Sequence, residues 1–213
     1  MKDSKIKRYS PIEEATNIWS HVLGIVLSII AIFFLVKHAI ELDSVLHIIS
    51  FSIYGFSMLT LYSASSIYHS RKSDEQRIYM RVFDHASIYI LIAGTYTPFT
   101  LITLHGKIGW IIFGLSWGMA LIGIILKLFF TGKFSIISTL MYIFMGWMII
   151  FAIKPLMSSL SADGLRWLIA GGISYTVGGI LYVIKKIKFN HAIFHILVLI
   201  GSICHFISIY FYV

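Results

Sequence analysis

Two histidines, His191 and His195, lie four residues apart at the start of the last long apolar run of the sequence. On a helix, this spacing places the two imidazoles one turn apart on the same face. Two neutral imidazoles placed in this way can bind one metal ion. The pair could also be two interfacial histidines that follow the basic loop of Lys185, Lys186 and Lys188. The metal hypothesis therefore depends on whether other elements bring further ligands to this place.

The composition predicts an integral membrane protein. Of the 213 residues, 58% are hydrophobic and only 12% are charged, whereas a soluble domain carries about 25% charged residues. The net charge of +8 would suggest nucleic acid binding in a soluble protein, but here the Lys and Arg residues lie in short loops, as membrane topology requires. We therefore expect membrane lipids, and no nucleic acid, as partners. The single cysteine, Cys204, excludes an internal disulfide and a cysteine-rich metal site.

Seven apolar runs predict the fold, because each is long enough for a membrane helix of about 20 residues. We expect an all-α integral membrane protein, a seven-transmembrane helix bundle that forms one membrane domain over residues 17–213. Residues 1–16 are polar, and Ser10, Pro11 and Glu13 have the pattern of a helix start, which predicts a short interfacial helix. The seven runs cover approximately residues 17–37, 45–68, 82–103, 107–128, 134–153, 165–184 and 190–212.

Two local features refine this expectation. Pro98 lies inside the third run and should kink that helix. The sixth run contains two glycine pairs, Gly171-Gly172 and Gly178-Gly179, seven residues apart. Small residues with such spacing are typical of a face on which another helix packs closely.

The distribution of basic residues predicts the orientation. The N-terminus and the even-numbered loops carry 13 of the 17 Lys and Arg residues, and the other side carries four. The N-terminus is therefore expected in the cytoplasm and, with seven spans, the C-terminus outside the cell. This topology places His69, Asp84, His191 and His195 in the same, cytoplasmic leaflet. The convergence supports a shared site, because the orientation was deduced from Lys and Arg alone.

Three histidines and an open fourth position are the arrangement of a catalytic zinc site, and zinc suits imidazole ligands. In this interpretation His69, His191 and His195 would bind Zn²⁺. Asp84 is the only acid within any of the seven runs, and an ionisable residue inside a membrane is a candidate functional residue. It would orient a water at the metal and take its proton. Ser65 would donate a hydrogen bond to the oxyanion formed when that water attacks a carbonyl.

Each polar residue also has a plain structural interpretation. Asp84 could pair with Arg81 on the same helix face, and Ser65 could bond to its own backbone. His21 could support the site from outside or contact lipid headgroups. His205 lies about 15 Å deeper than His195 along the helix, which is too far to bind the same ion, although both could line one cavity.

Longer motifs in the same order identify a family resemblance. The chain resembles bacterial hemolysin III proteins, which belong to the progestin and adipoQ receptor family together with the adiponectin receptors. The motifs that carry the resemblance are Glu14-Ala15-Thr16-Asn17-Ile18-Trp19-Ser20-His21, Ser65-Ser66-Ile67-Tyr68-His69, Phe83-Asp84-His85, Ala93-Gly94-Thr95-Tyr96-Thr97-Pro98, and the segment from His191 to His195 with His205.

The resemblance implies a seven-helix protein with a cytoplasmic N-terminus, in the bacterial plasma membrane. It implies zinc ligands at His69, His191 and His195, with Asp84 and Ser65 at the family's other functional positions. Related receptors are linked to ceramide hydrolysis, and the bacterial branch to hemolysis and membrane-lipid homeostasis. This sequence lacks the long N-terminal domain of the receptors and ends with the seventh helix, so a hormone-receptor role is not expected.

We therefore expect a zinc-dependent hydrolase of a lipid amide or ester, of the ceramidase kind. A non-enzymatic lipid or stress sensor with structural zinc would instead have a closed site with Asp84 as the fourth ligand. A pore-forming, lytic protein fits less well with a resident multi-pass sequence. A metal or proton transporter is disfavoured because, His205 apart, the polar residues cluster in one leaflet.

Overall fold

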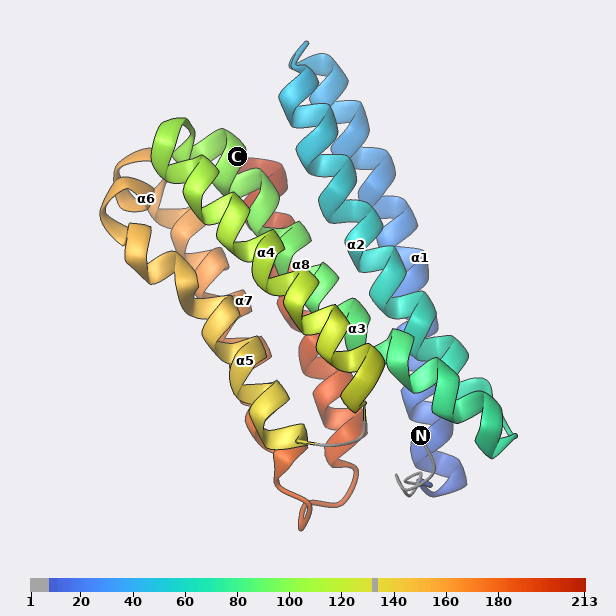
Figure 1. Ribbon diagram of the computed structural model, residues 1–213. Coiled ribbons are helices and arrows are strands. Elements are labelled where there is room, and N and C mark those ends of the chain that lie inside the picture. The colour runs from blue at the N-terminus through green and yellow to red at the C-terminus, as the bar shows by residue number, and fades with distance from the viewer. Residues whose placement is uncertain (1–7, 132–133) are drawn as a thin grey trace.

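The computed structural model describes residues 8–131 and 134–213, and this part of the chain is almost entirely helical with no β-strand (Figure 1). The long helices are joined by short turns, so the chain runs back and forth as a bundle. In chain order the elements are α1 (Pro11–Glu41), α2 (Val45–Ser70), α3 (Asp74–Pro98), a π-helix (Phe99–Leu104), α4 (Gly106–Phe130), α5 (Ser135–Trp147), a 3-10 helix (Met148–Ala152), α6 (Ile153–Ser159), α7 (Ala162–Val183) and α8 (Asn190–Tyr212).

Six helical segments of the described chain are long and apolar enough to cross a membrane. They are α1, α2, α3 with its π-helix, α4, the segment Ile136–Ser159 and α8. The sequence predicted a seventh span, and α7 has the length for it, with 22 residues. Its glycines and Arg166 lower its hydropathy, so it is not among the six. The helical membrane class is thus confirmed, and six of the seven spans have the expected length and composition.

The starts of the first and third helices differ in detail from the expectation. Ser10 does begin a helix, because its hydroxyl accepts a hydrogen bond from the Glu13 backbone N–H at 3.2 Å. From this start α1 continues unbroken to Glu41, so within the described residues the Ser10 start belongs to the first long helix itself. The third helix begins at Asp74 rather than near residue 82. This early start exists because Arg77 is buried against the N-terminal turns of the chain.

Pro98 changes the helix type instead of ending the third helix. Proline has no N–H to donate within the helix, and the chain continues from Pro98 as the π-helix Phe99–Leu104. Threonine hydroxyls bond the neighbouring carbonyls: Thr97 donates to Ala93 O and Thr100 to Tyr96 O, both at 2.9 Å. Both hydroxyls are buried, so these bonds give the threonine side chains partners inside an apolar segment.

The helices form a bundle around α3, in whose apolar segment 78% of the residues are buried, against 22–56% in the other spans. Helix α1 packs on α2 and α8, α7 packs on α8 and α5, and α3 packs on α2 and α4. Figure 1 shows the start of α1, the α2–α3 turn and the α7–α8 loop at one end of the bundle, which we call the N-terminal end. The C-terminus lies at the other end. This alternation brings the basic segments to one end, as the charge count requires.

The glycine pairs of α7 serve two packing faces rather than the single face that the sequence suggested. A Cβ atom on Gly171 would lie 1.9 Å from the His205 ring, and one on Gly178 would lie 3.2 Å from Leu197, both on α8. The neighbouring Gly172 and Gly179 point instead toward Trp147 and Thr139 at ordinary contact distances. Helix α7 therefore approaches α8 closely along one glycine of each pair.

We expect Gly171→Ala to destabilise the bundle by about 1–3 kcal/mol, because the new methyl group would collide with a buried ring. The matched control is Gly114→Ala, where a Cβ meets nothing within 4 Å. Melting temperatures in detergent would measure both variants. Equal melting temperatures for the two would contradict the close α7–α8 approach.

Candidate metal centre

Three histidines converge at the N-terminal end of the bundle. His69 lies in the last turn of α2, and His191 and His195 lie in the first turns of α8. All three are buried, and one ring nitrogen from each lies within 4.8 Å of the others. The Nε2 atoms of His69 and His191 are 2.9 Å apart. The structure thus brings together the three histidines that the sequence predicted as metal ligands.

The start of α8 is set by the end of α7. Phe189, just before α8, has a left-handed backbone with φ of 58°, which turns the chain into the helix. The Asn190 side-chain amide donates to the carbonyl of Tyr182 at 2.9 Å, across the α7–α8 loop. This bond holds the first residue of α8 against the end of α7, so His191 follows in a defined position.

Helix α1 supplies a partner to the outer nitrogen of two histidines. His69 Nδ1 donates to Glu14 Oε2 at 2.8 Å, and His195 Nδ1 donates to the backbone carbonyl of Asn17 at 3.3 Å. With the proton held on Nδ1, each ring keeps its Nε2 lone pair for a metal. Histidine ligands commonly show this pattern, in which a carboxylate or carbonyl fixes the ring and its tautomer.

Glu14 is central to this arrangement, although its place in the sequence predicts no role for it. Its second oxygen, Oε1, accepts a hydrogen bond from Arg77 Nη2 at 2.5 Å. The Arg77 guanidinium is buried and also lies over the Tyr68 ring, 5.1 Å from its centre. One feature of the sequence could have indicated this role. Glu14 is a carboxylate in the first turn of α1, on the same predicted side of the membrane as the histidines.

The donor set fits an ion that prefers nitrogen. Ligand nitrogens on a tetrahedral zinc, with bonds of 2.0–2.1 Å, lie about 3.3 Å apart. The separations here, 2.9 Å for one pair and at most 4.8 Å for all three, need only small side-chain adjustments to reach that value. Imidazole ligands without thiolate or carboxylate suit zinc among other metals.

Tyr9 covers this centre from outside. Its ring stacks on His191 with 4.8 Å between ring centres. Burial raises the pKa of the Tyr9 phenol far above its ordinary value.

Asp84 and Ser65 are buried beside the centre and line one cavity together with His191 and His195. The Asp84 carboxylate is not among the atoms close enough to share an ion with the histidines. Its Oδ2 atom lies 3.9 Å from Nε2 of the neighbouring His85. Asp84 is thus placed near the centre and outside its ligand group.

The cavity has a volume of about 140 Å³ and lies between α2, α3, α5, α7 and α8, with Lys127 of α4 at its wall. It also reaches His205, so this deeper histidine shares the cavity with the metal centre. His21 lines it as well, and its ring stacks on His195 with 3.7 Å between centres. Neither ring nitrogen of His21 has a hydrogen-bond partner within the described residues.

Comparison with known proteins gives the family. A family model described as "Haemolysin-III related" matches residues 9–206. The chain belongs to this family. It is 46% identical over 201 residues to Hemolysin-3 of Bacillus cereus, covering 94% of this chain and 92% of that protein. It is equally similar, 46% over 200 residues and 94% of each chain, to the Hemolysin-3 homolog of Bacillus subtilis.

A more distant human relative extends the comparison. The monocyte to macrophage differentiation factor is 28% identical over 214 residues, which cover 96% of this chain and 87% of that protein. The resemblance deduced from the motifs is therefore confirmed at the level of the family. A Haemolysin-III related protein with apolar helices of this length is a multi-pass membrane protein.

The Glu14–Arg77 pair should contribute to the stability of this family member. Removing one partner of a buried ion pair costs about 3–5 kcal/mol, and Glu14 is partly exposed, so we expect about 3 kcal/mol for Arg77→Met. The control is Arg71→Met, an exposed position where the change should stay within about 0.5 kcal/mol. Thermal unfolding in detergent measures both, and a stable Arg77→Met protein would argue against the pair.

Proposed function

We propose that this Haemolysin-III related protein is a zinc-dependent hydrolase that cleaves an amide or ester bond of a membrane lipid. The observation that carries the proposal is the combination of three clustered, buried histidines with a separate buried carboxylate on the same cavity. A site built only to hold a structural metal would use the carboxylate as the fourth ligand. Keeping Asp84 outside the ligand group leaves it available for proton transfer.

Each residue of the site has a distinct role in this proposed reaction. His69, His191 and His195 would hold the zinc, which when bound supplies Lewis-acid activation of water and carbonyl oxygen. Asp84 takes the proton of the attacking water and returns it to the leaving group. Ser65 donates a hydrogen bond to the oxygen on which negative charge develops.

The surroundings of the site favour a lipid as substrate. The cavity wall is largely apolar, with Leu61, Ile88, Leu91 and Val198 among its side chains. The outer faces of the helices are apolar too, and exposed residues such as Phe129 require a lipid environment. A substrate that partitions into the bilayer would reach this cavity without leaving the membrane.

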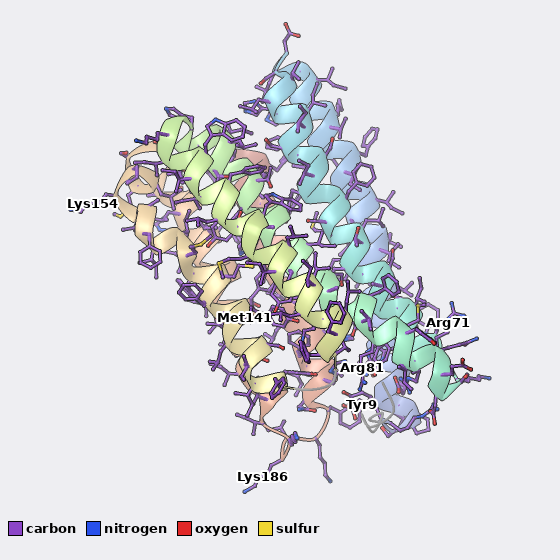
Figure 2. All side chains as sticks on the ribbon, in the orientation of Figure 1. Tyr9, Arg71, Arg81, Met141, Lys154 and Lys186 are labelled. Atoms are coloured by element: carbon purple, nitrogen blue, oxygen red, sulfur yellow. The ribbon has the colours of Figure 1, made fainter. Side chains whose placement is uncertain are left out.

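We propose that the reaction takes place in the cytoplasmic leaflet of a bacterial plasma membrane. This orientation takes α7 as the seventh span and rests on the excess of basic residues at the N-terminal end. Figure 2 shows Arg71, Arg81 and Lys186 toward this end and Lys154 near the other. The N-terminus is then cytoplasmic and the C-terminus extracellular.

Membrane lysis is the second candidate, because relatives at 46% identity carry the name Hemolysin-3. Dye-loaded liposomes separate it from hydrolysis. Leakage caused by folded wild-type protein, and absent with a heat-denatured control, would favour lysis. A lipid or stress sensor with a structural metal is a third, favoured if the metal binds and no lipid is hydrolysed.

Zinc content tests the centre. We expect the wild type to bind about one zinc per chain and the His69/His191/His195 triple alanine variant to bind none. Glu14→Gln should weaken zinc binding about 10–100-fold, because the ring of His69 loses its carboxylate partner. The exposed Glu75→Gln is the matched control. Stoichiometric zinc in the triple variant, measured by elemental analysis, would remove the assignment.

Hydrolysis tests the role of Asp84. Zinc-loaded Asp84→Asn should keep its zinc and lose about 10²-fold or more in rate, the contribution typical of general acid–base catalysis. Asp163→Asn, at an exposed position, should match the wild type. The assay follows fatty acid release from ceramides, lysolipids and acyl amides. No release from any of them by the zinc-loaded wild type would refute the enzyme.

A further inference from the structure

Lys127, near the end of α4, is a buried cation on the wall of the cavity. The residue is only 4% exposed. Its ammonium donates a hydrogen bond to the Ser138 hydroxyl of α5 at 2.5 Å and lies 5.8 Å from the centre of the Tyr142 ring. A lysine at the end of a membrane helix ordinarily extends its side chain to the interface. This one is instead directed inward, between α4 and α5.

No carboxylate balances this charge in the part of the chain that the structure describes. The ion pairs there do not include Lys127, and the charged group that acts on it electrostatically is another cation, Arg81. Asp84, the acid on the same cavity, has no ion pair with Lys127 among the described residues, and its carboxylate lies 3.9 Å from the His85 ring nitrogen. A buried ammonium is costly unless it has an anionic partner, and its two remaining N–H donors can serve one.

The cavity beside Lys127 is elongated along α8. It reaches both His191 and His205, and these residues are 14 positions apart on α8, or about 21 Å at 1.5 Å per residue. This length is roughly two thirds of the hydrocarbon core of a bilayer, about 30 Å. Most of the surface between these ends is apolar, as an acyl chain requires.

We propose that Lys127, with Ser138, binds the anionic group of an acidic lipid whose hydrocarbon chain occupies the cavity. The group is a carboxylate or a phosphate, since both offer oxygens that accept charge-assisted hydrogen bonds from an ammonium. The lipid-binding site does not depend on the proposed hydrolase. The further statement that acidic lipids are the substrate class does rest on that proposed function.

The test measures lipid binding to the full chain in detergent, after chelator treatment so that no metal can hold a carboxylate. Radiolabelled oleate is compared with oleyl alcohol, which has the same chain and no charge, and dioleoyl phosphatidic acid with dioleoylglycerol. We expect each acidic lipid to bind the wild type at least about tenfold more tightly than its neutral counterpart. Equal affinities for both pairs would overturn the proposal.

Substitutions assign the effect to the residue. Lys127→Met should weaken the binding of acidic lipids about tenfold or more and leave the binding of neutral lipids unchanged. Lys127→Arg should retain most of the affinity for acidic lipids. The control is Lys186→Met, in the exposed α7–α8 loop (Figure 2). If Lys127→Met loses affinity for oleate alone, the bound group is a free carboxylate. If it loses affinity for phosphatidic acid alone, the bound group is a phosphate headgroup. Unchanged acidic-lipid affinity in Lys127→Met would overturn the assignment.

A measurement on wild-type protein covers the case in which Lys127→Met does not fold. A carbodiimide activates the oleate carboxylate, the lysine amine attacks it, and an amide forms as the urea leaves. Peptide mass spectrometry should find this adduct on Lys127, and adducts on other lysines alone would overturn the proposal.

The outcomes separate the two proposals. Binding of acidic lipids that persists in the His69/His191/His195 triple alanine variant, together with absent hydrolysis by the wild type, counts against the hydrolase and supports the lysine site. Hydrolysis by Lys127→Met at wild-type rates on acidic lipids counts against the lysine site alone.

Discussion

The Glu14 carboxylate joins three helices at the candidate metal centre. One of its oxygens accepts from His69 of α2 and the other from Arg77 of α3, and the residue itself belongs to the first turn of α1. A carboxylate in this partly buried position needs both donors to offset its desolvation. The same bonds orient the His69 ring and hold the early start of α3, so the local geometry of the centre depends on this one group.

The surrounding structure separates polar from apolar functions along the bundle. The three clustered histidines and Asp84 lie toward the N-terminal end, where three helix ends meet. The cavity then runs deeper along α8 between apolar walls, with Lys127 as a charged position at its side. This division matches what a lipid presents, a polar reacting group joined to a long hydrocarbon chain. The glycines Gly171 and Gly178 let α7 lie directly against α8, the helix that carries two of the three clustered histidines.

Much of this arrangement was predictable from local sequence. The spacing of His191 and His195 determines a shared helix face, and the basic loops place His69 and Asp84 at the same end of the bundle. The contacts of α1 were not predictable, because the approach of Glu14 to His69 and of Asn17 to His195 depends on how the first helix packs against α2 and α8. The start of α3 was misjudged for the same reason: hydropathy favours a helix from residue 82, whereas tertiary contacts of Arg77 extend it. From the sequence, Lys127 indicated only the orientation of the chain in the membrane. Its inward direction was not predictable, because it depends on the position of α5.

The direct contact between α1 and α8 has a consequence for how the protein is made. The chain emerges from the ribosome from its N-terminus, so α1 with Glu14 and Asn17 enters the membrane first and α8 with His191 and His195 enters last. The centre can therefore form only after the last helix has been made. An ion bound there would join His69 of α2 to His191 and His195 of α8, and so link an early helix to the latest one.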